Sequence, residues 1–436
     1  MALEPMIAEL ANKLNDKTIV RRRDFHRHAE TGWTEFRTAS IVADELTRLG
    51  YQVLVGEEVV DADNMMGVPA PNELEQHARR AITQGASPEW VSKMAGGKTG
   101  VMGILEFTKP GPTVALRFDL DANDANEAET REHRPSCENF GSINKGAMHA
   151  CGHDGHAAVG LAIAEILAEL KDGLRGKIKF IFQPAEEGVR GAKAMVAKGI
   201  VDDVDYLLGM HFGFQLQKTG QIACNVKGFL ATSKYDATFT GVPAHAGAAP
   251  EVGRNALLAA AVAVLNLHAI PRHSLGSSRI NVGIMHAGSG RNVIPSKAVI
   301  KLETRGGNSA INKFMADEAY RVINAAAAMH GVNVDIKEVG GAAGCSNSRE
   351  LANDLTAIAK ELGIFSEIVD ECDFGASEDC SYFMERVQER GGQAAYALIG
   401  VGLAAGHHDS YFDFDESALG MAVKFVGTAA ANLLMR

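Results

Sequence analysis

The stretch His149–His156, HACGHDGH, concentrates side chains that can bind a metal ion. It holds one thiol and three imidazoles, and its remaining residues are Ala, Gly and Asp. Thiolate sulfur and imidazole nitrogen are common protein ligands of transition metals. Residues two apart in an extended segment project to the same side, so Cys151 and His153 could share one metal site.

Adjacent carboxylates at Glu186 and Glu187 add what a hydrolytic centre needs. Their side chains diverge, so one can bind a metal ion while the other accepts a proton from water beside that ion. The further candidate ligands are Cys151, His153, His211 and one of the pair His407 and His408. Together these exceed the four ligands of a typical zinc site and suit two ions about 3.5–4 Å apart. The residue types therefore predict metal-dependent hydrolysis.

Four short, continuous apolar runs predict the strands that would position these residues. The runs are typical of buried parallel strands and lie at 113–118, 177–182, 205–210 and 394–399. Predicted helices alternate with them, so we expect an α/β domain built on a mainly parallel sheet. Ligands of such sheets gather beyond the carboxyl ends of the strands. Each run is followed there by Asp, Glu or His, so the sequence predicts one site at this edge.

Each candidate residue also has a purely structural explanation. Cys151 could be a small buried hydrophobe, His153 a polar residue at a helix start, and His211 a core histidine bonded to a carbonyl. The two glutamates could form a solvated turn, and the histidine pair could lie in an exposed loop. These explanations weaken when taken together, because all the residues fall at the same edge of one predicted sheet.

The segment 228–342 breaks the alternating pattern. Its apolar periodicity predicts the order β-α-β-β-α-β, which is that of ferredoxin-like domains. The run at 394–399 resumes the first pattern, so we interpret 228–342 as a second domain inserted between 1–227 and 343–436. Residues 60–100 are polar and partly helical, and we interpret them as a further insertion near the sheet.

The composition of the chain argues against nucleic-acid-binding and membrane-spanning proteins. The chain has 436 residues and a formal net charge of −11, which argues against nucleic acid as a partner. Its start carries acids early, and no stretch reaches the ~20 apolar residues of a membrane span. The six cysteines include no CxxC pair and are expected to be reduced thiols. We therefore expect a cytoplasmic protein.

Six motifs together resemble the aminoacylase/carboxypeptidase family of metallopeptidases, near its hippurate and auxin-amide hydrolases. They are FHRHAETGWTEFRTAS (25–40), GAMHACGHDGH (146–156), IFQPAEEGVRGAKAM (181–195), GVPAHAGAAPEVGRNAL (241–257), GSGRNVIP (288–295) and GASEDCSYF (375–383). The resemblance covers nearly the whole chain except 60–100. Two motifs depart from the family pattern: Pro-Glu after FHxH reads Ala29-Glu30, and HSPxF near the C-terminus reads HDSYF. The second departure leaves the choice between His407 and His408 open.

The resemblance implies a role for each candidate residue. It makes Glu186 the general base. The inserted domain would be a lid and dimerisation domain, whose His245 would reach the active site of the partner subunit and steady the oxyanion. Asn292 and Arg305 would bind the free carboxylate of the substrate, although His245 could be a loop histidine and Arg305 could pair with a surface acid. The implied metal ligands are Cys151, His153, Glu187, His211 and His408.

The resemblance also implies the cofactor, the reaction and the assembly. A thiolate favours zinc and carboxylates suit manganese, and the resemblance implies two Mn²⁺ ions with Zn²⁺ as the alternative. The expected reaction is hydrolysis of an N-acyl or N-aroyl amino acid that has a free carboxylate, above all p-aminobenzoyl-glutamate. The expected assembly is a homodimer through the inserted domain, a heteromer with a homologous second subunit, or both.

Two other functions stay open, and a third is disfavoured. The substrate could be another N-acyl amino acid, such as a hippurate-like conjugate. The chain could also be a non-catalytic metal-binding scaffold for a homologous subunit. A redox protein built on the thiol of Cys151 is disfavoured, because no resolving cysteine lies nearby in the sequence.

Overall fold

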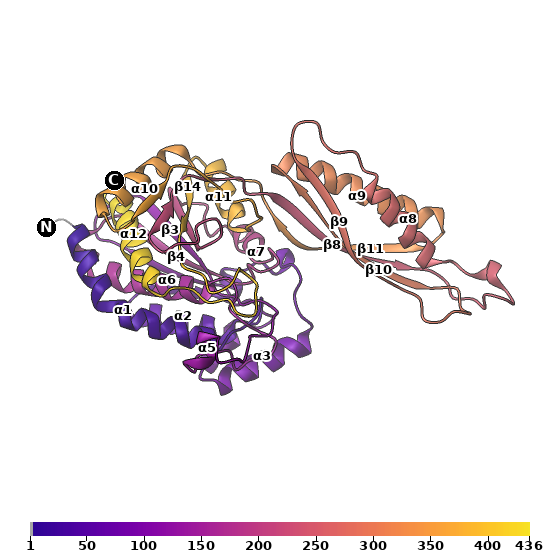
Figure 1. The fold of residues 1–436 in the computed structure, drawn as a ribbon, viewed down its shortest axis with the longest axis horizontal. Coiled ribbons are helices and arrows are strands. Elements are labelled where there is room, and N and C mark those ends of the chain that lie inside the picture. The colour runs from indigo at the N-terminus through magenta and orange to yellow at the C-terminus, as the bar shows by residue number, and fades with distance from the viewer. Residues whose placement is uncertain (1–2) are drawn as a thin grey trace. The chain divides into compact units, whose positions relative to one another are not determined.

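The structure is a computed structural model that describes residues 3–436. The chain forms two compact units (Figure 1). Unit 1 contains the chain up to Lys227 together with Ser346–Phe374 and Asp379–Arg436. Unit 2 contains Gly228–Cys345 and Gly375–Glu378.

Unit 1 is built on an eight-stranded sheet whose order is β1-β2-β4-β3-β5-β14-β6-β12. Its strands are β1 (Gln52–Val55), β2 (Val101–Glu106), β3 (Thr113–Asp119), β4 (Lys177–Gln183), β5 (Tyr206–Phe212), β6 (Gln221–Ala223), β12 (Glu367–Val369) and β14 (Gln393–Ile399). The four central strands β4, β3, β5 and β14 are parallel, and β1, β2 and β6 introduce antiparallel pairs at the sides. These four strands contain the four apolar runs, except that β5 begins at Tyr206, so the mainly parallel sheet predicted from the sequence is confirmed. A short pair, β7 (Val226–Lys227) and β13 (Cys372–Asp373), lies beside it.

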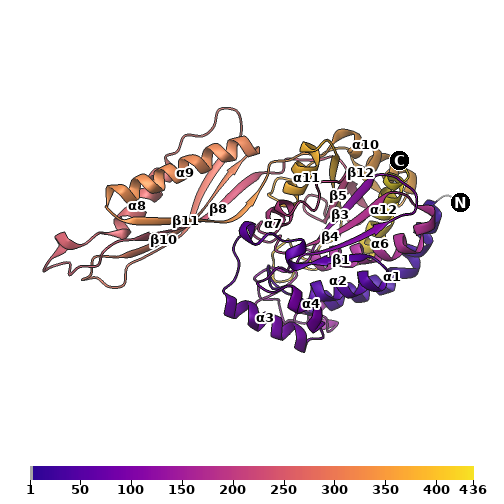
Figure 2. The ribbon, with the colours of Figure 1, turned by 180° about the vertical axis from the view of Figure 1, so that it is seen from behind.

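Helices cover both faces of this sheet (Figure 2). The helices of unit 1 are α1 (Leu3–Arg27), α2 (Phe36–Arg48), α3 (Pro71–Thr83), α4 (Pro88–Lys93), α5 (Arg134–Cys137), α6 (His153–Glu169), α7 (Ala192–Ala197), α10 (Arg349–Leu362), α11 (Cys380–Glu389) and α12 (Ser417–Leu434). α1, α6 and α12 pack together on one face, while α11 packs on β5 and β14 with α7 beside it. The strands are Val-, Ile- and Phe-rich because both of their faces are buried.

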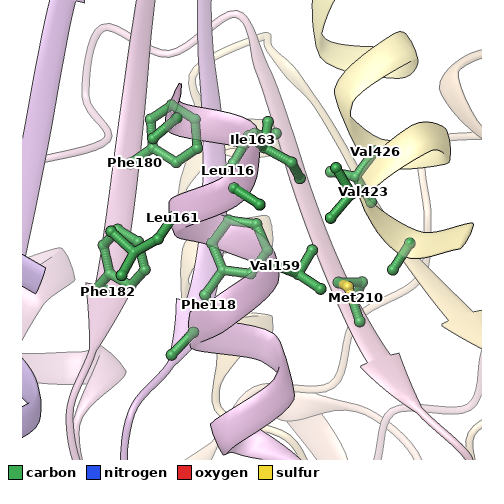
Figure 3. Close-up of a cluster of buried hydrophobic side chains, with 14 of the residues drawn as sticks. Leu116, Phe118, Val159, Leu161, Ile163, Phe180, Phe182, Met210, Val423 and Val426 are labelled. Atoms are coloured by element: carbon green, nitrogen blue, oxygen red, sulfur yellow. The ribbon is translucent and has the colours of Figure 1, made fainter. Parts of the chain in front are cut away.

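The core of unit 1 lies where β3, β4 and β5 meet α6 and α12 (Figure 3). Phe118 and Phe180 stack with their ring centroids 6.5 Å apart, and both are fully buried. Val159 of α6 and Val423 of α12 pack on the same cluster. Burying each side chain of this kind contributes about 1.5–3 kcal/mol. This packing fixes the start of α6 against the carboxyl ends of the strands.

Helix α12 is long and apolar enough to span a membrane by length and composition alone. In the structure 72% of it is buried, and it packs against α1, α6 and α10. Such burial is typical of a core helix.

Unit 2 has the ferredoxin-like order that the sequence predicts. Its elements are β8 (Ala231–Thr240), α8 (Ala256–His268), β9 (Ser278–Ala287), β10 (Lys297–Gly306), α9 (Ser309–Met329) and β11 (Asn333–Ala342). The strands form one antiparallel sheet in the order β11-β8-β10-β9, with β9 at an edge. The two helices pack on the sheet through small side chains such as Ala259, Ala263 and Ala319.

Candidate metal centre

The stretch HACGHDGH meets the carboxyl ends of β4 and β5 inside unit 1. Cys151, His153 and His211 each offer a ligand atom, and these three atoms lie within 4.8 Å of one another. Cys151 Sγ lies 3.4 Å from His211 Nε2. All three residues are buried. The structure thus brings together three predicted ligands from a turn, a helix and a strand.

The reason why Cys151 and His153 converge differs from the prediction. We expected an extended segment, but Gly152 adopts a left-handed conformation with φ of 96°. His153 is the first residue of α6. Glycine adopts the left-handed backbone conformation without a steric cost, so Gly152 allows this turn.

A second group of ligand atoms shares the same thiol. Cys151, Glu187 and His408 also offer atoms within 4.8 Å of one another. His408 Nε2 lies 3.3 Å from Glu187 Oε1. Because Cys151 belongs to both groups, the five predicted ligands form two adjacent sets joined by one sulfur.

Two buried atoms of this cluster make no hydrogen bond to any described residue: His153 Nε2, and Glu187 Oε1, which has His408 Nε2 at 3.3 Å as an ion-pair partner. An unsatisfied buried polar atom is costly, and a metal ion would satisfy both. The Nδ1 of His153 donates to the carbonyl of Asp121 at 2.9 Å, which leaves the Nε2 lone pair for a ligand. The donor set of thiol, imidazoles and carboxylate therefore fits divalent metal ions.

The protonation states of His211 and Glu187 are those that binding of a metal ion requires. Burial, reinforced by neighbouring histidines, holds the pKa of His211 well below its usual range, so the ring is neutral as ligation requires. Its Nδ1 donates to the carbonyl of Phe212 at 2.7 Å, which leaves Nε2 free to bind an ion. Burial opposes the charge of Glu187, but His408 and His153 lower the pKa of that carboxyl to about 2. Glu187 is therefore ionised.

The neighbouring histidines His407 and His408 differ in their surroundings. His407 Nε2 accepts the backbone N–H of Phe214 at 3.0 Å, and burial lowers the pKa of His407 to about 4. His408 adopts φ of 67° and lies beside Glu187. The structure thus brings His408, and not His407, into the cluster of ligand atoms.

Glu186 and Glu187 are presented by a turn that Asp121 holds. The backbone N–H of Glu186 donates to Asp121 Oδ1 at 3.0 Å, and that of Glu187 donates to Asp121 Oδ2 at 2.8 Å. The side chain of Glu186 lies at the rim of the cluster, with Oε2 at 3.9 Å from His153 Nε2. Glu187 thus belongs to a group that contains Cys151, whereas Glu186 lies near His153 and Glu187 and belongs to neither group that contains Cys151.

Supporting residues such as His156 are not among the sequence-predicted site residues. His156 Nδ1 donates to Asp119 at 2.7 Å, and its Nε2 accepts the N–H of Phe212 at 3.1 Å. Both ring nitrogens are used, so His156 fixes the end of β5 next to His211. Asp119 and Asp121 follow directly after a predicted strand, so the sequence places them at this edge of the sheet, but it assigns them no role.

Buried Glu35 supports the same turn. Its Oε1 accepts the N–H of Ala185 at 2.8 Å, and its Oε2 accepts the hydroxyl of Thr99 at 2.6 Å. Burial, followed by the charge of Asp121, raises the pKa of Glu35 from its usual 4.5 to about 8. Folding therefore favours the neutral carboxyl.

We expect Glu35→Gln to make the metal-free protein more stable toward neutral and weakly alkaline pH. The raised pKa means that wild-type stability falls as pH rises from about 4.5 to about 8, because the unfolded chain ionises Glu35 before the folded chain does. Glutamine does not ionise. The difference in Tm between variant and wild type should widen across this window and level off above it. A difference that stays constant with pH would contradict the assignment.

The three site residues predicted in unit 2 have defined local partners. His245 is exposed, and its Nδ1 accepts the N–H groups of Gly247 and Ala248 at 3.2 and 3.1 Å. The carbonyl of Asn292 accepts the N–H of Ala246 at 3.0 Å, so the PAHAG and GRNVIP segments lie side by side. Arg305 forms an ion pair with Glu303 on the same strand, with Nε at 2.9 Å from Oε1. The alternative that Arg305 pairs with an acid is thus realised.

Comparisons with known proteins place the chain in a family. The model of peptidase family M20/M25/M40 matches residues 115–432. A protein of Escherichia coli that is named as one subunit of p-aminobenzoyl-glutamate hydrolase is 48% identical over 425 residues, with 97% of each chain covered. The indole-3-acetyl-aspartic acid hydrolase of Enterobacter agglomerans is 48% identical over 429 residues, with 98% of each covered.

Solved structures agree with these relatives. An aminobenzoyl-glutamate utilization protein from Klebsiella pneumoniae has a TM-score of 0.85 and 43% identity, with 97% of each chain covered. The YXEP protein of Bacillus subtilis, described as a dinuclear metal binding peptidase, has the same fold with a TM-score of 0.67 and 22% identity over 97% of this chain and 99% of that one. The family resemblance inferred from the motifs is confirmed, and the chain belongs to peptidase family M20/M25/M40.

Proposed function

We propose that this member of the family is a metal-dependent amidohydrolase that cleaves p-aminobenzoyl-glutamate to p-aminobenzoate and glutamate. The observation that carries the proposal is the pair of ligand groups joined by Cys151, with the carboxylate of Glu186 beside them. The names of the similar proteins support the substrate class, because two of them act on amides of glutamate or aspartate. An indole-3-acetyl-aspartate conjugate is therefore the second candidate, ahead of hippurate-like amides.

The proposed roles follow from the geometry of the cluster. When bound, two divalent ions would polarise the amide carbonyl and acidify water. Glu186 accepts a proton from the attacking water and passes it to the amide nitrogen as the carbon–nitrogen bond breaks. The products are then a carboxylic acid and a free amino acid. The residues proposed to hold the two ions are Cys151, His153, Glu187, His211 and His408.

Manganese is the proposed working ion. The ligands combine one soft thiolate with imidazoles and a carboxylate, so the donor set alone also accepts zinc. We keep Mn²⁺ first on the family resemblance and Zn²⁺ second. Activity of chelated protein reloaded with each ion in turn would rank them.

Cys151 is expected to resist alkylation in metal-loaded protein and to react after chelation. Ligation uses the sulfur lone pairs, whereas burial and the charge of Glu187 raise the pKa of the free thiol. Labelling with iodoacetamide at alkaline pH, followed by peptide mass spectrometry, measures both states. The exposed Cys137 is the internal control and should label equally with and without metal. Equal labelling of Cys151 in both states would reject its role as a ligand.

Unit 2 is proposed to bind the substrate carboxylate and a second subunit. Asn292 and Arg305 keep the proposed carboxylate role, for which Arg305 would have to exchange or share its partner Glu303. His245 keeps the proposed role at the oxyanion of a partner subunit. These three assignments are supported by the family resemblance.

The surface of unit 2 supports a homodimer. Strand β9 has an unpaired edge, and its Ile284 and Met285 are 43% and 39% exposed. On α8, Leu258 and Leu265 are 47% and 74% exposed. A long, apolar edge strand usually pairs with another chain, so β9 and α8 are the proposed dimer face. A heteromer with a homologous subunit is the alternative, since the names of two relatives describe one subunit of a hydrolase or a homolog of that subunit. We keep the cytoplasm as the proposed location.

Product release by the purified chain tests the proposed function. With Mn²⁺ present, p-aminobenzoyl-glutamate should yield equal amounts of p-aminobenzoate and glutamate, faster than hippurate yields glycine. Indole-3-acetyl-aspartate serves as the acidic comparison. A chain that binds metal yet hydrolyses none of the three, alone or with a homologous subunit, would be the scaffold.

A further inference from the structure

The turn that carries Glu186 and Glu187 has an unusual backbone. Ala185 adopts φ of 51° and Val189 φ of 59°, in the left-handed region that L residues rarely occupy. A β-branched residue there is a genuine outlier. Such conformations persist only where the surroundings hold them, so the contacts of this turn decide where the two glutamates point.

Buried carboxylates hold most N–H groups of the turn. Glu35 accepts from Ala185, and Asp121 accepts from both glutamates. Asp379 Oδ2 accepts from Gly191 at 3.0 Å and from Ala192 at 2.9 Å. The N–H side of the turn is therefore fixed by acceptors from other parts of unit 1.

The carbonyl of Glu187 is held by a different kind of group. Arg190 Nε donates to it at 2.8 Å. The Nη1 of the same guanidinium donates to the carbonyl of Gly67 at 3.2 Å, within segment 60–100. Trp33, which is fully buried, donates from Nε1 to the neighbouring carbonyl of Met66 at 2.7 Å. Arg190 thus connects the proposed ligand Glu187 to a segment whose position Trp33 fixes.

Gly32 leaves the space that this arginine occupies. A Cβ at Gly32 would lie 2.4 Å from Arg190 Nη2 and 3.0 Å from the Cβ of Ala185. A side chain at position 32 would therefore displace the end of the Arg190 guanidinium and would also press on Ala185 of the turn. Within residues 3–436, Arg190 is bonded to backbone carbonyls and to no carboxylate, although the chain carries a net charge of −11. Its described hydrogen bonds all go to backbone carbonyls.

We infer that Arg190 is a positioning residue for the Glu186–Glu187 turn and that residues 66–67 of the 60–100 segment are its anchor. The inference rests on the proposed function, in which Glu187 binds metal and Glu186 accepts a proton. In this inference, segment 60–100 supports the turn that carries Glu186 and Glu187.

Two substitutions test the link from opposite sides. Arg190→Gln removes the double donor, and Gly32→Ala displaces it without changing any charge. Each should weaken Mn²⁺ binding about 10–100-fold, the range for losing an outer partner of a metal ligand. Arg190→Lys can reach one carbonyl but not both, so its effect should be intermediate. The effects of Gly32→Ala and Arg190→Gln should not add in the double variant, and any further loss of Mn²⁺ affinity there measures the direct contact of the new Cβ with Ala185.

Steady-state kinetics separate positioning from substrate contact. At saturating Mn²⁺, kcat should fall by the same factor for the glutamate conjugate and for hippurate, with KM little changed. Arg79→Gln, at an exposed arginine of α3, is the matched control and should match wild type in Mn²⁺ affinity and kcat. A loss limited to KM for the acidic conjugate would overturn the inference, because Arg190 would then contact the substrate. Unchanged Mn²⁺ affinity and kcat in Arg190→Gln would also overturn it.

A parallel Glu187→Gln variant keeps this test distinct from that of the proposed function. If Glu187→Gln keeps its Mn²⁺ while Arg190→Gln does not, the ligand assignment fails on its own. If Glu187→Gln loses Mn²⁺ and Arg190→Gln binds it normally, only the positioning role fails. Melting temperatures identify variants that do not fold, and Arg190→Lys then decides the outcome by the same two readouts.

Discussion

Glu186→Gln is expected to keep its metal ions and to lose about 10²–10⁴-fold in kcat, the contribution of a general base. Glutamine has nearly the same shape but cannot accept the proton of the attacking water. The backbone of Glu186 would stay in place, because Asp121 binds its N–H and not its side chain. Steady-state kinetics on p-aminobenzoyl-glutamate, with metal content by elemental analysis, measure both quantities.

Glu187→Gln is the matched control for that variant. The two glutamates are adjacent and share Asp121, yet only Glu187 lies with Cys151 and His408. The Glu187→Gln variant should bind less metal, and its activity should fall for that reason. If Glu186→Gln lost the metal and Glu187→Gln kept it, the two roles would be exchanged.

His245→Ala is expected to lower kcat about 10²–10³-fold, the loss typical of one oxyanion donor. The Nδ1 of His245 already accepts two backbone N–H groups, so Nε2 carries the proton that can be donated to an oxyanion. If His245 acts in a partner subunit, mixing His245→Ala with Glu186→Gln should restore activity. Each mixed dimer would contain one site with both groups intact.

Subunit exchange must be shown for the mixing result to count. Tagged and untagged chains that co-purify after incubation provide that control. No recovery despite exchange would mean that His245 acts within its own chain or has no part in the reaction. Recovery by mixing two preparations of His245→Ala would instead reveal contamination.

The sequence predicted the sheet and the ligand types because both are local properties. Each central strand is a continuous apolar run, and its carboxyl end is marked by Asp, Glu or His. The order of the inserted segment was readable for the same reason, since helix and strand periodicities differ in each element. Glu303 could also have been recognised as the partner of Arg305, because residues two apart on a strand project to one face.

The remaining features depend on backbone geometry that residue types do not encode. His408 lies in the cluster of ligand atoms with its backbone in the left-handed conformation. Its neighbour His407 instead accepts a hydrogen bond from the backbone N–H of Phe214. The sequence therefore left both histidines open. The contacts of segment 60–100 also depend on the tertiary structure. Met66 accepts the hydrogen bond of Trp33 through its backbone carbonyl, which every residue type has, so the sequence does not indicate this contact. That segment could be recognised only as an insertion.

Titration of metal-free protein with Mn²⁺ while hydrolysis is followed tests the central claim most directly. Bound metal by elemental analysis and release of p-aminobenzoate are measured on the same samples. We predict that two ions bind per chain and that activity on p-aminobenzoyl-glutamate appears only as the sites fill. Full activity in excess chelator with no bound metal would contradict a metal-dependent amidohydrolase.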